Sequence, residues 1–116
     1  MRQKMEKSNS GNLPSAEAVR LEKLIEYSAN SIVSRELVKT KTTTLTLFAF
    51  DGGQGLSEHS APFDAIVQIL EGEAELMIDG QNILTRAGET VLMPANIPHA
   101  VRANKKFKML LTMIRG

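Results

Sequence analysis

The sequence predicts an all-β fold, a small barrel preceded by a short N-terminal helix. Three observations lead to this class. From Ile32 onward, apolar and polar residues alternate with a period of two in short runs. Gly-, Asn- and Asp-containing turns separate these runs at close spacing, and no helical period follows residue 30. With 116 residues and 42% hydrophobic content, the chain fits one domain with a single core.

The N-terminal part divides into a tail and a helical segment. Residues 1–13 are polar and without periodicity, so we expect a disordered tail. Residues 14–30 are expected to be helical, because Ser15 can cap a helix and apolar residues follow on one face. Those apolar residues are Val19, Leu21, Leu24 and Ile25. The barrel is expected over 31–116.

Eight or nine short strands account for the remainder of the chain. The first is expected within 32–38, and the clearest is the β-forming run 45–50. Asp79-Gly80 is a strong hairpin signal between two of the later strands. Further strands are expected at 65–70, 74–78, 82–85, 90–93, 99–102 and 107–114. Such a series is typical of a sandwich or barrel rather than a βαβ fold.

Composition excludes several functions. The chain has no Cys, which rules out thiol nucleophiles, iron–sulfur clusters and cysteine-based zinc sites. A net charge of +1, no Trp and one Tyr argue against nucleic-acid binding, and the basic cluster from Arg102 to Lys108 is expected to be a solvated hairpin rim. No apolar run is long enough to cross a membrane and no secretory signal is visible, so a cytoplasmic location is expected.

The two histidines, His59 and His99, are the candidate metal ligands. Each is expected at the start of a strand, just after a turn-rich stretch. Neutral imidazole is the commonest metal ligand, and two rings meeting inside a barrel could hold a divalent ion. The alternative is that each ring only makes a hydrogen bond at a strand end, because the spacing of the two residues carries no specific signal.

Two segments resemble the motifs of the cupin family. Residues 55–63 with 69–75 resemble the first motif, and residues 87–101 resemble the second. In the second, Gly88, five residues, Pro94 and then His99 five positions later reproduce the family spacing. The resemblance implies a double-stranded β-helix, or jelly-roll barrel, often a homodimer, with a pocket at one open end.

The resemblance also implies a metal site of two His and one Glu from the first motif and one His from the second. His59 and His99 match two of these positions, but Ala61 and Ala65 occupy the other two and cannot ligate. The four-ligand shell therefore cannot form. A divalent transition metal (Fe, Mn, Ni or Zn) would need His59 and His99 plus water, Gln68 or Asp64, and Asp64 needs a β-bulge to point inward. Asn96 replaces a motif glycine.

An apolar pocket is expected inside the barrel, although filling of the core is the alternative role for the same side chains. Its candidate lining residues are Phe48, Phe50, Gln68, Met77, Met93 and Met109. The leading hypothesis is a protein that binds a small, largely apolar molecule, with the two histidines as polar anchors. The alternatives are a metal-dependent oxygenase or isomerase acting on a small organic substrate, and a structural dimer with a filled barrel. No inward Arg or Lys is indicated, so sugar phosphates fit poorly.

Overall fold

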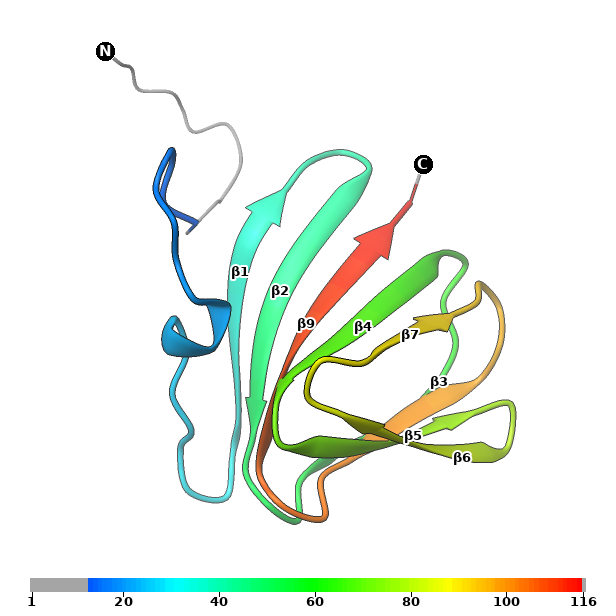
Figure 1. Ribbon diagram of the computed structural model, residues 1–116. Helices are drawn as coiled ribbons and strands as arrows, with labels where there is room; N and C mark the ends of the chain where they lie inside the picture. Colours follow the sequence, from blue (N-terminus) through cyan, green and yellow to red (C-terminus); the bar gives the residue numbers. More distant parts are fainter. Residues whose placement is uncertain (1–12, 116) are drawn as a thin grey trace.

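The computed structural model describes residues 13–115, which fold into two antiparallel sheets (Figure 1). The larger sheet has the strand order β1-β2-β9-β4-β7 and the smaller one the order β3-β8-β5-β6. The larger comprises β1 (Ile32–Lys39), β2 (Thr43–Phe50), β9 (Phe107–Ile114), β4 (Asp64–Glu71) and β7 (Thr90–Met93). The smaller comprises β3 (Gly55–His59), β8 (His99–Arg102), β5 (Glu73–Ile78) and β6 (Gln81–Arg86). Neighbours far apart in the sequence make this a jelly roll, which confirms the all-β prediction.

Period-two alternation decides which side chains enter the barrel. In β4, Ala65, Val67 and Ile69 are buried in the interior cluster, whereas Gln68 between them is exposed on the opposite face. The interior is filled mainly by aromatic and aliphatic side chains. Phe50 and Phe107 are both fully buried, and their rings stack with centroids 4.6 Å apart. The other buried members of this cluster are Ala74, Leu76, Met93, Val101, Ala103 and Met109.

The helix expected over 14–30 is wrong in extent. Within the described residues it shrinks to one 3-10 turn, η1 (Leu21–Lys23), and Ala16 has a left-handed backbone with φ of 59°. We call residues 13–30 the strap. Apart from η1, the strap is irregular chain that lies beside the larger sheet (Figure 1). Short helices depend on tertiary packing. Here Leu21, Leu24 and Ile25 instead cover the outer face of the sheet.

Polar contacts also fix the strap. The Tyr27 hydroxyl donates to Glu71 Oε2 at 2.6 Å, and Lys108 Nζ donates to the Glu22 carbonyl at 2.7 Å. Lys108 is only 6% exposed, and its ammonium group and that of Lys106 lie 5.0 and 4.8 Å from the centroid of the Tyr27 ring. The prediction that the basic cluster forms a solvated rim is therefore wrong for Lys108, whereas Lys106 is exposed as expected.

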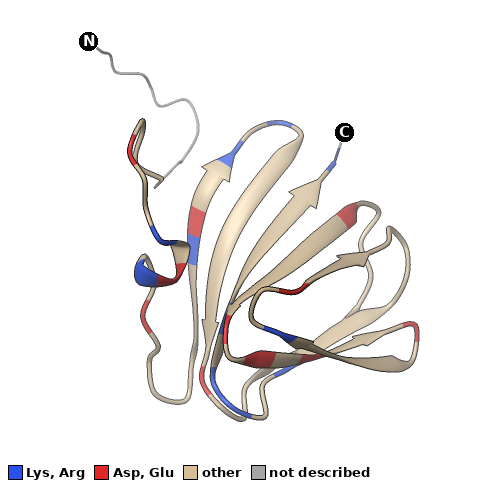
Figure 2. Ribbon diagram, viewed as in Figure 1, with Lys and Arg blue, Asp and Glu red and all other residues tan. Residues whose placement is uncertain are grey.

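Charged residues lie mainly on the strap, the loops and the strand ends (Figure 2). In the part of the chain that the structure describes, no helix is long and apolar enough to cross a membrane. The disordered tail expected over 1–13 lies outside the described residues except for Leu13, whose N–H donates to the Leu37 carbonyl.

Candidate functional site

Loops 60–63 and 94–98 meet at one end of the barrel, which we call the mouth. The Asn96 N–H donates to the Ala61 carbonyl at 2.7 Å, and the Ala95 N–H donates to Asp64 Oδ1 at 2.9 Å. Asn96 has a left-handed backbone with φ of 65°, a conformation that Asn tolerates better than most residues. This explains why Asn can stand where the related motif has glycine. The loop that leads into His99 is thus held at two points.

The histidines come from neighbouring strands of the smaller sheet. His59 is the last residue of β3 rather than the first of a strand as expected, and His99 is the first residue of β8. A β-bulge makes them face each other. Leu56 pairs with Val101 and His59 with His99, so two residues of β3 lie opposite one residue of β8. In a regular strand, His59 would lie on the opposite face from Leu56.

The two imidazole rings are in direct contact. Their centroids are 4.4 Å apart and their planes are inclined by 67°. His99 is only 8% exposed, whereas His59 is open to solvent. His59 Nδ1 lies 3.0 Å from the Ser57 carbonyl oxygen, and His99 Nδ1 lies 3.2 Å from that of Ile97. A carbonyl oxygen only accepts, so each Nδ1 donates the hydrogen in these contacts, which selects the tautomer with the lone pair on Nε2.

Neither of the two expected third ligands is brought to the histidines. Asp64 and Gln68 are both exposed and lie on the face of β4 opposite Ala65 and Val67. The register shift recorded in β4 falls between Ile69 and Glu71, so no bulge turns Asp64 inward. Its carboxylate instead accepts from the main chain of loop 94–98. Gln68 points away from the core because side chains alternate between the two faces of β4.

The expected pocket residues divide into three groups. Phe50, Met93 and Met109 are buried members of the core, and the half-buried Phe48 packs against them. Gln68 is on the outer face, as described above. Met77 pairs with Ala100 on the outer face of the smaller sheet, so it does not line the interior. The hydrophobicity of these residues predicted burial well but could not separate pocket wall from filled core.

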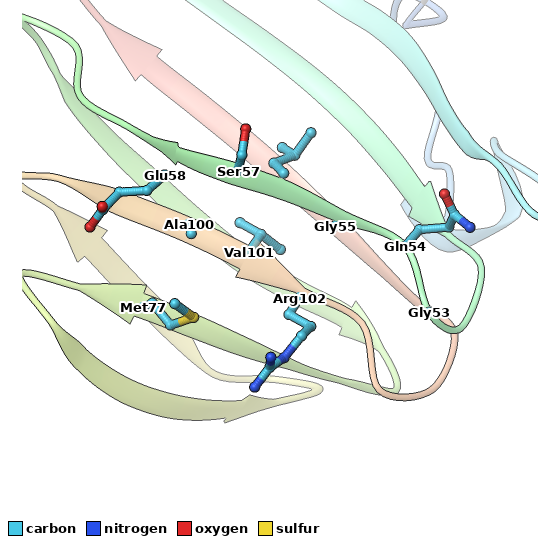
Figure 3. Close-up of a pocket in the computed structure, with 10 residues that line it drawn as sticks. Gly53, Gln54, Gly55, Ser57, Glu58, Met77, Ala100, Val101 and Arg102 are labelled. Carbon is cyan, nitrogen blue, oxygen red and sulfur yellow. The ribbon is translucent and has the colours of Figure 1, made fainter.

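Met77 instead borders a shallow hollow of about 350 Å³ on the outside of the smaller sheet (Figure 3). Glu58 and Arg102 lie at its margin, and Arg102 Nε donates to Glu75 Oε1 at 2.8 Å. Gly55 forms part of the hollow, and a Cβ there would lie 2.6 Å from the Val101 carbonyl oxygen. The lining residues do not include either histidine, so the hollow is a separate surface.

Arg115 is a residue beside the mouth that the sequence did not single out. It follows β9, in which Met109, Leu111 and Met113 belong to the interior cluster, so alternation places residue 115 on the same face. Its Nη2 donates to Thr44 Oγ1, and its guanidinium carbon lies 5.6 Å from the centroid of the Phe63 ring, in loop 60–63. The signal that could have found it is this continuing alternation beyond the last predicted strand.

The side chains at the mouth can supply two ligands to a metal ion, rather than the four of the family's usual site. Among residues 13–115, no group of three His, Cys, Asp or Glu residues is placed to hold a metal. Two imidazoles bound to one ion with bonds of about 2.1 Å have centroids roughly 4.6 Å apart at a right angle and roughly 5.3 Å apart at the tetrahedral angle. The observed 4.4 Å is near the first value, so the two rings are close enough to be neighbouring ligands of one ion.

Comparisons with known proteins agree with this architecture. A conserved protein of unknown function from Streptococcus pyogenes is 36% identical, with a TM-score of 0.88, and the match covers 95% of this chain and 96% of that one. A cupin superfamily protein from Desulfitobacterium hafniense is 31% identical, with a TM-score of 0.85, and the match covers 90% and 96%. A search of curated proteins finds no match. The family model for the cupin domain matches residues 46–115, and the chain therefore belongs to the cupin family.

Proposed function

We propose that the protein binds a small, largely apolar molecule at the mouth of the barrel, with His59 and His99 as its polar anchors. The observation that carries this proposal is the contact between the two rings, each with Nδ1 hydrogen-bonded to a main-chain carbonyl. Both Nε2 atoms can then accept a hydrogen bond or bind an ion. Because Phe50, Phe107 and Met109 fill the deeper barrel, the ligand lies at the mouth.

A divalent transition metal is the second part of the proposal. His59 and His99 would hold it through Nε2, and the remaining positions would be filled by water or by the ligand. When bound, such an ion supplies a Lewis acid that polarises a ligand oxygen. The chain's own contribution is orientation, since the Ser57 and Ile97 carbonyls select the nitrogen that each ring presents.

A metal-dependent oxygenase or isomerase is the alternative. A two-histidine set leaves coordination positions open, as catalytic metal sites do. However, the described residues provide no third His or carboxylate ligand beside the pair. We therefore place binding ahead of catalysis, and turnover of a small organic substrate by metal-loaded protein would reverse that order.

Metal analysis and ligand binding test the proposal together. Protein purified without a histidine tag is dialysed against Zn²⁺, Ni²⁺ or Mn²⁺, and bound metal is measured beside thermal shifts with a panel of small apolar ligands. We expect a His59→Ala, His99→Ala double variant to lose binding, while a Gln68→Ala control on the outer face retains it. Equal binding by the wild type and the double variant, or no binding of metal or ligand by the wild type, would contradict the proposal.

The homodimer and the cytoplasmic location expected from the sequence stay predictions. Sedimentation velocity at micromolar concentration checks the first, and a sole monomeric species would contradict it. Fractionation of cells that express the protein checks the second.

A further inference from the structure

We infer that Arg115 binds the carboxylate of the ligand, so that the mouth accepts a small organic acid. This inference rests on the proposed function and names its ligand class. Three features carry it: the position of the guanidinium group, its lack of a carboxylate partner among the described residues, and the apolar wall between it and the histidines.

Arg115 is exposed at the end of β9, and alternation along that strand places it on the face that lines the barrel interior. It hydrogen-bonds to Thr44, which is only 7% exposed and pairs with Met113 of the interior cluster. The Arg115 N–H donates to the Thr42 carbonyl at 2.7 Å, which fixes the start of the side chain. The guanidinium group also lies over Phe63, in the loop that follows His59. The cation is thus held between the beginning of β2 and the loop that joins β3 to β4.

The charge of Arg115 is uncompensated within the described residues. Arg102 pairs with Glu75 and Arg86 lies near Glu73, whereas no described carboxylate forms an ion pair with Arg115. The nearest acidic residue along the neighbouring strand, Asp64, is on the outer face and already accepts from the main chain. A guanidinium group has five N–H donors in a planar fork, and Thr44 accepts from only one of its nitrogens. The remaining donors suit a carboxylate.

The wall between the cation and the imidazoles is apolar. Met113 pairs with Ala65, and Ala65 pairs with Met93, the residue that precedes loop 94–98. A ligand lying along this wall needs a carboxylate at one end, a short hydrocarbon body and a polar group or coordinated ion at the other. A small monocarboxylic acid meets these requirements better than a neutral molecule of the same shape.

A matched acid and amide test the inference. We would titrate 3-methylbutanoate and 3-methylbutanamide at constant ionic strength and follow the methionine methyl signals by NMR. Ligands of so few atoms are expected to bind in the millimolar range, so the titration extends to tens of millimolar. The acid is expected to bind about tenfold more tightly than the amide.

Substitution then assigns the preference to one residue. Arg115→Gln is expected to weaken acid binding about tenfold and to leave amide binding unchanged, and Arg115→Lys should fall between the two. Arg86→Gln is the matched control, because Arg86 is an exposed arginine at the opposite end of the smaller sheet's strands. Thermal unfolding of each variant separates lost binding from lost folding.

The outcomes separate this inference from the proposed function. Equal affinity for acid and amide in the wild type, no binding of the acid, or an unchanged acid preference in folded Arg115→Gln would overturn the role of Arg115. If the His59→Ala, His99→Ala variant binds the acid as the wild type does, the histidine anchors are wrong while the arginine site stands.

Discussion

At the scale of single residues, main-chain carbonyls prepare the histidine pair. A carbonyl oxygen can only accept, so the Ser57 and Ile97 carbonyls hold hydrogen on both Nδ1 atoms. Both rings therefore present the same kind of nitrogen. The bulge before His59 brings its ring to the ring of His99. In the proposed site, these local contacts decide which nitrogen each ring would offer to a ligand.

Asp64 accepts a hydrogen bond from loop 94–98 and lies on the outer face of β4, so we expect it to stabilise this loop. We predict that Asp64→Ala lowers the free energy of unfolding by about 1 kcal/mol, because the Ala95 N–H loses its acceptor. Asp64→Asn, which keeps an acceptor oxygen, should lose less. Urea denaturation measures stability, and dialysis measures metal binding, which both variants should retain. Loss of metal at unchanged stability would show that Asp64 is a ligand after all.

The sequence could predict some of these residues but not their roles. His59 and His99 stand at motif positions, but their contact also needs the β-bulge in β3, which the sequence did not predict. Asp64 could not be assigned, since its orientation depends on whether a bulge precedes it. Arg115 was missed because its contact with Thr44 joins residues 71 positions apart at the end of the last strand.

At the scale of elements, the strap shows tertiary packing overriding a helical pattern. Its apolar residues have helical spacing in the sequence, yet an irregular path allows Ile25 and Tyr27 to reach the sheet together. Lys108 and Glu71 belong to strands of the larger sheet, and their side chains hydrogen-bond to Glu22 and Tyr27 of the strap. Such partners lie far away in the sequence, so the helix prediction failed where the strand predictions succeeded.

Tyr27 should make the attachment of the strap dependent on alkaline pH. Burial, the hydrogen bond to Glu71 and the charge of Glu71 raise the pKa of Tyr27, and these effects outweigh the nearby Lys106 and Lys108. A raised folded-state pKa means that this contribution to stability is complete below the ordinary value of about 10 and is lost as pH rises above it.

The comparison is with Tyr27→Phe, which removes the titrating group. Wild-type protein should be more stable than the variant at about pH 8, and this difference should shrink by about pH 11. Urea denaturation at both pH values measures the difference in the free energy of unfolding. Because the chain has one tyrosine, tyrosinate absorbance reports its ionisation directly. A constant difference across this range would contradict the assignment.

At the scale of the whole molecule, a filled barrel supports the mouth. Alternation of β-forming residues sufficed to predict an all-β sandwich or barrel, and the resemblance to the cupin motifs added the jelly-roll topology. What alternation could not predict is which interior side chains fill the core. Phe50 and Phe107 pair and stack where β2 ends and β9 begins, so they fill the part of the barrel farthest from the mouth.

A substitution in this core should therefore lower the free energy of unfolding. Phe107→Ala is expected to cost about 3–5 kcal/mol, since it leaves a cavity beside Phe50. Leu84→Ala, at an exposed position on the outer face of the smaller sheet, is the control and should change stability little. Thermal or urea unfolding measures both. A small loss of unfolding free energy for Phe107→Ala would mean that the core around Phe50 is not tightly packed.

The most direct test of the proposed histidine pair is a nitrogen NMR spectrum of the imidazole rings. It is recorded before and during titration with Zn²⁺. The chain has two histidines, so each signal can be assigned with one substitution. We predict hydrogen on Nδ1 of both rings in the free protein and a joint shift of both Nε2 signals that ends at one ion per chain. A ring with hydrogen on Nε2 instead, or Zn²⁺ that perturbs only one ring, would contradict it.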